Sequence, residues 1–144
     1  MGRQADAPGS ALTAPGLVTV RSAFPARLTV DRLVHEIEAR GLKIFCRVDH
    51  SANATEVGLT LRPTELLIFG SGRGGTPLMA ASQTLGLDLP LKALAWEDTD
   101  GQSWLSYNEP SWLAARHGIK AADAGPVAAL SAAIAAVTKA AAMP

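Results

Sequence analysis

The three histidines of this 144-residue chain are its natural proton-transfer groups, and one of them has neighbours that favour chemistry. His50 lies between Asp49 and Ser51, directly after a run typical of a strand. It is the best candidate for handling a proton or contacting a ligand. His35 falls on the polar side of a predicted helix, which indicates a solvated side chain. His117 lies in the last turn of another helix, where the helix dipole favours a cation.

Lys92 and Tyr107 are the next candidates, because they fall on two strands that a short turn joins. The segment Asp98–Gly101 is typical of a hairpin, and we expect a two-residue turn there. Even positions of the first strand then lie opposite odd positions of the second. This register predicts one face with Lys92, Leu94, Trp96, Leu105 and Tyr107, and another with Ala93, Ala95, Glu97, Trp104 and Ser106. An ammonium and a phenol beside apolar walls would hold a small polar or anionic molecule. The alternative is that both polar tips reach solvent.

A glycine-rich segment follows the predicted strand Glu65–Phe69 and has the spacing G-x-G-x-x-G at Gly70, Gly72 and Gly75. Thr76 is the expected N-cap of the next helix, with Pro77 at its first position, and Thr76 joins His50, Lys92 and Tyr107 as a candidate ligand-binding residue. The spacing is that of a dinucleotide fingerprint. The chain is too short for two mononucleotide-binding halves, however, so we expect no dinucleotide. A plain turn and a simple anion site stay open as interpretations.

Composition excludes several classes of function. Lys and Arg together number 13, as do Asp and Glu, so no basic surface for nucleic acid or an anionic membrane is expected. The single cysteine, Cys46, cannot form an intrachain disulfide and is expected to be a buried thiol. Residues 1–16 lack the apolar core of a signal peptide, and the apolar run 126–137 is too short to span a bilayer. We therefore expect a cytoplasmic protein with no metal and no cofactor.

The pattern of elements predicts a tail over residues 1–16, which we expect to be disordered, and one α+β domain over residues 17–144. Thr29 is the expected cap of the first helix, and Gly41 the expected end. A run of strands after this helix favours a mostly antiparallel sheet with the helices on one face. The predicted strands are Leu17–Phe24, Leu42–Val48, Glu65–Phe69, Leu91–Glu97 and Gln102–Asn108, and the predicted helices are Val30–Arg40, Thr76 to about Thr84, Pro110–His117 and Pro126–Ala142.

Residual apolar surface predicts a homodimer. In the expected register Trp96 and Trp104 point to opposite faces of the hairpin, and the alanine-rich helix Pro126–Ala142 has a surface suited to close packing. The alternative is that this helix folds back and covers the hairpin within the same chain.

Several segments, in this order, resemble the family known as "domain of unknown function 302": Arg47–Ser51, Glu65–Gly70, Gly75–Met79, Gly86–Lys92, Trp96–Asp98, Trp104–Asn108 and Leu113–Gly118. The resemblance implies a fold similar to the TATA-box-binding-protein-like α+β class, with no DNA binding implied. It implies no activity. A small-molecule-binding module is the function we expect. The alternatives are an enzyme of redox or sulfur metabolism that uses His50 with Lys92 or Tyr107, and a structural partner that acts through its surface.

Overall fold

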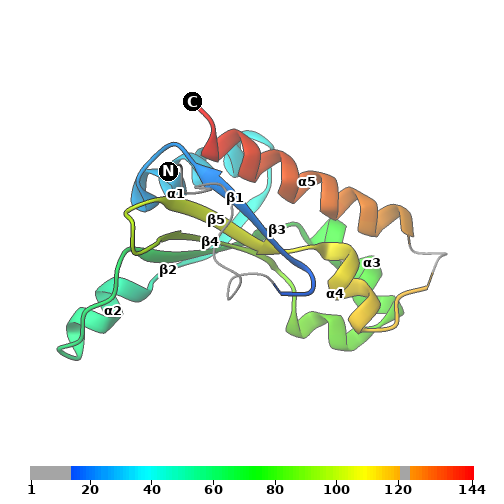
Figure 1. Ribbon diagram of the computed structural model, residues 1–144. Helices are drawn as coiled ribbons and strands as arrows, with labels where there is room; N and C mark the ends of the chain where they lie inside the picture. The colour runs from blue at the N-terminus through cyan, green and yellow to red at the C-terminus, as the bar shows by residue number, and fades with distance from the viewer. Residues whose placement is uncertain (1–13, 121–123) are drawn as a thin grey trace.

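Five antiparallel strands form one sheet in the order β1-β5-β4-β3-β2, which confirms the α+β class (Figure 1). The computed structural model describes residues 14–120 and 124–144, so most of the predicted tail lies outside the described residues. The strands are β1 (Leu17–Ser22), β2 (Lys43–Asp49), β3 (Thr64–Gly70), β4 (Leu91–Glu97) and β5 (Ser103–Asn108). The helices are α1 (Ala26–Ala39), α2 (His50–Glu56), α3 (Gly72–Ala81), the 3-10 helix η2 (Gln83–Leu87), α4 (Pro110–Arg116) and α5 (Ala124–Ala142).

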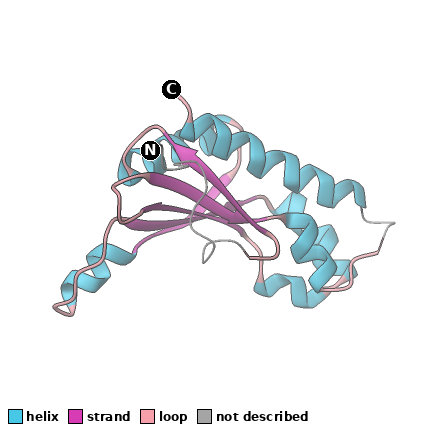
Figure 2. Ribbon diagram, viewed as in Figure 1, coloured by secondary structure: helices cyan, strands magenta, loops and turns pink. Residues whose placement is uncertain are grey.

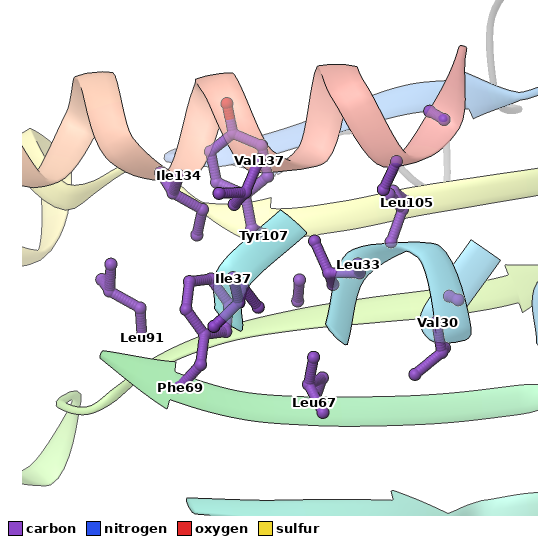
Figure 3. Packing of buried hydrophobic residues seen from close by; sticks show 14 of the residues in the cluster. Val30, Leu33, Ile37, Leu67, Phe69, Leu91, Leu105, Tyr107, Ile134 and Val137 are labelled. Atoms are coloured by element: carbon purple, nitrogen blue, oxygen red, sulfur yellow. The ribbon is translucent and has the colours of Figure 1, made fainter. Parts of the chain in front are cut away.

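Helices α1 and α5 cover one face of the sheet, and the main core lies between them and the strands (Figures 2 and 3). Apolar residues at helical spacing on α1 meet β3, β4 and β5, because a stripe three and four residues apart faces one way. The fully buried members are Val30, Leu33, Ile37, Leu67, Phe69, Ala95, Leu105, Ile134, Val137 and Ala141. Helices α3 and α4 lie together beyond one end of the sheet, and α2 projects from the other (Figure 1).

The C-terminal helix folds back onto its own chain. Arg32 of α1 donates to the carbonyl oxygens of Ala141 at 2.9 Å and Met143 at 2.6 Å, which ties the two helices together. Helix α5 is long and apolar enough, by length and composition alone, to cross a membrane. Here its apolar side is used to bury Ile134 and Val137 against the core.

Two helices begin four residues earlier than expected. Helix α1 starts at Ala26, so Thr29 is a buried helical residue instead of the cap, and its hydroxyl bonds that of Ser22 at 2.6 Å. Helix α3 starts at Gly72 and has Ser71 as its cap, since the Ser71 hydroxyl accepts from the Arg73 amide. The glycine-rich segment is therefore largely helical, and Thr76 lies inside the helix.

Strand β2 does not alternate as predicted. A bulge between Ile44 and Cys46 inserts Phe45, which reverses the faces of the residues that follow it. Ile44 packs toward the main core, whereas Cys46 lies opposite Ile68 on the other face. The expectation of a buried thiol is therefore wrong, because Cys46 is exposed.

The hairpin register also differs from the prediction. The β4–β5 loop closes with the Asp98 amide donating to the Gln102 carbonyl at 2.9 Å, and Gly101 has a φ of 81°. Three residues therefore lie between the last paired positions, Asp98 and Gln102. A three-residue hairpin loop needs one residue in the left-handed conformation, which Gly101 provides. Odd positions consequently face odd positions. Trp96 pairs with Trp104 on one face, with ring centroids 6.3 Å apart, and the prediction that they point opposite ways is wrong.

Candidate functional site

The corrected register separates Lys92 from Tyr107. Tyr107 pairs with Ala93 on the core face and is 7% exposed. Figure 3 shows its side chain pointing toward α5. Burial raises the pKa of its phenol, and a hydrogen bond with Thr138 acts in the opposite direction. Lys92 pairs with Ile68 on the other face of the sheet. The two side chains therefore do not share one face, contrary to prediction.

Lys92 is engaged with its own chain. Its ammonium donates to the carbonyl oxygen of Pro90 at 3.0 Å and to that of Asp88 at 3.4 Å. Burial lowers the pKa of this ammonium, and the charge of Asp88 raises it. The group therefore holds the turn before β4 in place.

His50 and Thr76 lie apart from both groups. His50 is the first residue of α2 and follows Asp49 of β2. Asp49 pairs with Glu65 of β3, which in turn pairs with Ala95 of β4. Lys92 lies on β4, two strands away from β2 and three residues along β4 from Ala95. The backbones of His50 and Lys92 are therefore roughly 14 Å or more apart. Thr76 is exposed on α3. The four residues chosen from the sequence are not brought together in one site.

A polar cluster that sequence reasoning missed surrounds Asp88. Its carboxylate lies 2.5 Å from Nε2 of His117, whose Nδ1 lies 2.9 Å from the Thr84 hydroxyl, and Arg116 adds a contact at 3.1 Å. Hydroxyl, imidazole and carboxylate in a row form a possible proton relay. The apolar cavity described next is not lined by Thr84, Asp88 or His117, and the cluster joins η2 to the end of α4. We interpret it as a structural cross-link. His117 is the C-cap residue of α4, at the helix end where the dipole was expected to favour a cation.

A cavity of about 320 Å³ lies at the α3 end of the sheet. Its walls are almost entirely apolar, and they come from four separate parts of the chain. The lining residues are Phe45, Gly70, Ser71, Gly72, Gly75, Met79, Leu89, Pro90, Leu91 and Leu130. The size lies at the lower end of the range for small-molecule pockets.

Glycines make this cavity possible. A Cβ on Gly75 would meet Leu89 at 3.3 Å and Met79 at 3.5 Å, so the bare backbone is what allows these walls to close. A Cβ on Gly72 would meet nothing within 4 Å, which leaves that side of α3 open. The sequence did single out this glycine-rich segment. It carried no sign that Phe45, Leu89 and Leu130 would surround it.

Two cations stand near the mouth of the cavity. The Lys43 ammonium lies 4.8 Å from the centroid of the Phe45 ring, and Lys43 pairs directly with Gly70. Arg73 is exposed beside Gly72 in the first turn of α3. Within residues 14–120 and 124–144, no ion pair joins either cation to a carboxylate. The same residues contain no group of three side chains that could hold a metal ion.

These features define an α+β domain with an antiparallel sheet, two helices on one face and an apolar cavity at the end of the sheet. The crystal structure of an uncharacterized conserved DUF302 protein from Bacillus stearothermophilus has the same fold. Its TM-score is 0.78 at 18% identity, over 88% of this chain and 98% of that chain. The chain belongs to the family described as "Domain of unknown function DUF302", whose pattern matches residues 18–137.

Curated relatives of closer sequence carry a channel name. A protein named fluoride-specific ion channel FluC 1 from Brucella suis biovar 1 (strain 1330) is 48% identical over 112 residues, which is 78% of this chain and 44% of that protein. A protein of the same name from Brucella abortus biovar 1 (strain 9-941) has the same identity, with 42% of its length matched. The chain thus spans less than half the length of these relatives.

Proposed function

We propose that this chain is a small-molecule-binding module whose ligand has an apolar body and an anionic end. The cavity beside the glycine-rich turn carries the proposal. It offers apolar walls of ligand size, which would take the body of the molecule out of water. Lys43, held against the Phe45 ring, is a cation near the rim without a described carboxylate partner. A carboxylate at the mouth would supply one.

The cavity suits a small amphipathic anion better than the four residues chosen from the sequence. Tyr107 faces α5, and Lys92 is bonded to two carbonyl oxygens. A general base must reach the proton that it moves, within about 3 Å or through one water. His50, two strands away from Lys92, does not meet this condition. The alternative of an enzyme built on His50 with Lys92 or Tyr107 therefore has little support.

Isothermal titration with straight-chain carboxylates of increasing length, from butanoate to decanoate, tests the proposal. We expect affinity to rise with chain length until the cavity is filled, reaching a Kd of about 1 mM or better, with the alcohol of equal length binding more weakly. Gly72→Leu should weaken binding at least tenfold, because Gly72 lines the cavity and a large side chain there competes with the ligand for space. Gly125→Leu is the matched control, since a Cβ there also meets nothing within 4 Å and Gly125 lies on α5 outside the lining. No binding at 10-fold higher concentration (about 10 mM), or equal loss in both variants, would contradict the proposal.

A second function is favoured by the Brucella relatives, namely that this chain acts beside a fluoride channel. A membrane-spanning channel requires helices or a closed barrel, because lipid cannot hydrogen-bond an open sheet edge. The matched region here is an open sheet with edges β1 and β2. The channel name therefore fits the unmatched part of those relatives, which leaves the DUF302 part as a companion module.

Fluoride efflux from liposomes tests this second function. The part of the Brucella suis relative that this chain does not match is reconstituted alone or with this chain added. We expect the added chain to bind the liposomes and change the efflux rate at least twofold. Unchanged efflux together with no binding to the liposomes would refute the companion role and would leave the cavity proposal standing.

A further inference from the structure

The sheet face opposite α1 and α5 is mainly apolar. The strand registers place fifteen side chains on it, and three of them, Arg21, Lys43 and Lys92, are charged. An antiparallel sheet with one solvated face usually alternates apolar and polar residues, so this composition is unusual for a wet surface. The fifteen residues, called the open face below, are Leu17, Thr19, Arg21, Lys43, Cys46, Val48, Thr64, Leu66, Ile68, Lys92, Leu94, Trp96, Trp104, Ser106 and Asn108.

No described helix packs over the open face, since the core contacts of α1 and α5 are all with the opposite one (Figure 1). Leu66, Ile68, Leu94 and Trp96 are each only half-buried, whereas Trp104 and Ser106 of β5 are buried within the single chain. The face is also hollowed by a cavity of about 290 Å³ that reaches from Leu17 to Trp96. Apolar patches of this extent on a folded chain mark contact surfaces.

We propose that a second copy of this chain packs on the open face, sheet against sheet, about a twofold axis. An axis that lies between the sheets, perpendicular to the strands and level with Leu94, brings β4 of each copy over β4 of the other in the reverse direction. The two sheets would be about 10 Å apart and within about 30° of alignment, as in sandwiches.

Charge complementarity favours a second copy. Lys92 stands at one end of β4, and Asp98 follows the other end, where it accepts from the Trp104 indole at 2.9 Å. In the reversed pair, Lys92 of each copy approaches the Trp96 ring and the acidic end of the other. An ammonium near an indole face and a carboxylate is stabilised by both. The interface would then have a dry centre at Leu94 and charged groups at its rim, as stable interfaces have.

The area of the open face approaches that of a standard dimer interface. Five strands about 4.8 Å apart and about 23 Å long give a flat footprint of about 550 Å². The accessible area is larger than this flat footprint because side chains protrude from the sheet. It therefore comes closer to the roughly 800 Å² per partner of a standard interface. Exposed Leu59 and Leu61, next to the β3 end of the face, extend the same surface.

Light scattering with size-exclusion chromatography at about 50 μM, where a contact with a Kd near 1 μM would be saturated, tests the proposal. We expect twice the chain mass of 14.9 kDa. Leu94→Glu should give the monomer mass with unchanged circular dichroism, because the half-buried site tolerates a charge in the monomer but not at a dry interface centre. Leu87→Glu is the control: Leu87 is 78% exposed and lies off the open face, so the dimer should persist.

Three outcomes would overturn the proposal: a wild-type chain that runs as a monomer at this concentration, a Leu94→Glu variant that stays dimeric, or equal dissociation by Leu87→Glu. If Leu94→Glu fails to fold, Lys92→Glu serves in its place. That variant reverses the charge at the rim and should weaken the dimer at least tenfold. Lys92→Glu with undiminished dimerisation would count against the proposed pairing.

Discussion

Arg47 neutralises a carboxylate that the fold has buried, and its removal should be costly. Its Nε lies 3.0 Å from Oε1 of Glu65, whose side chain is 8% exposed on the α1 side of the sheet. Arg47 also reaches Asp31 of α1 at 2.7 Å, but that carboxylate is 53% exposed. The Arg47 guanidinium thus pairs with one buried and one solvated carboxylate. Loss of the pair should cost more at the buried carboxylate, because water cannot replace the guanidinium there.

The expected cost of Arg47→Met is about 2–3 kcal/mol in free energy of unfolding. At 3 Å and an effective dielectric constant of about 20, the gross attraction is about 5 kcal/mol. Removing one partner of a buried pair typically costs about 3–5 kcal/mol, and the partial exposure of Arg47 argues for the lower end or below. Asp31→Asn should cost less than about 1 kcal/mol, because an exposed pair contributes little.

Urea unfolding at pH 7, followed by tryptophan fluorescence, measures these values. Arg40→Met is the matched control, since its partner Glu36 lies on the surface of α1. The double variant Arg47→Met with Glu65→Leu should recover to within about 1 kcal/mol of the wild type, because no charge is then left buried. A single-variant loss below about 0.5 kcal/mol, or a double variant less stable than the single, would refute the reasoning.

Three further outcomes are expected. Gly72→Ala should raise the free energy of unfolding by about 0.5–1 kcal/mol, because Gly72 is helical and the added methyl group contacts nothing within 4 Å. Gly41→Ala should lower it, because Gly41 has a φ of 72°. Thermal melting compares the two variants, and a lower melting temperature for Gly72→Ala would contradict the first expectation. The hydrogen bond from Trp104 is the largest cause that lowers the pKa of Asp98 from 3.8. This hydrogen bond stabilises the fold fully above pH 3.8, and the stabilisation is lost as the pH falls through the lower pKa of folded Asp98. The difference in free energy of unfolding between wild type and Trp104→Phe should therefore become smaller in acid. A difference that stays constant from about pH 6 to pH 2 would exclude this role for the hydrogen bond. Burial raises the pKa of the Tyr107 phenol above 10.0. Stability should therefore decline as the pH rises above 10, and Tyr107→Phe should decline less in alkaline urea titrations.

Local signals in the sequence determined the elements and the class of fold. Val30, Leu33 and Ile37 recur at helical spacing, and Gly41 ends their helix with a positive φ, so α1 follows from residues near one another in the chain. The succession of strands after this helix indicated an antiparallel sheet for the same reason. Helix starts were less certain, because Ser71 and Thr76 are both good caps and only the surroundings choose between them.

Tertiary structure decided the faces and the site. One inserted residue at Phe45, and one more residue in the loop before Gln102, reversed which side chains share a face, because the side-chain period of a strand is two. Neither change leaves a strong mark in the sequence. The candidate cavity depends on Leu89 and Leu130, which come from distant segments of the chain. An apolar residue at either position is equally expected for core packing, so its type does not indicate a binding site. Hydrophobic contact is non-directional, so no local pattern says which distant walls will meet.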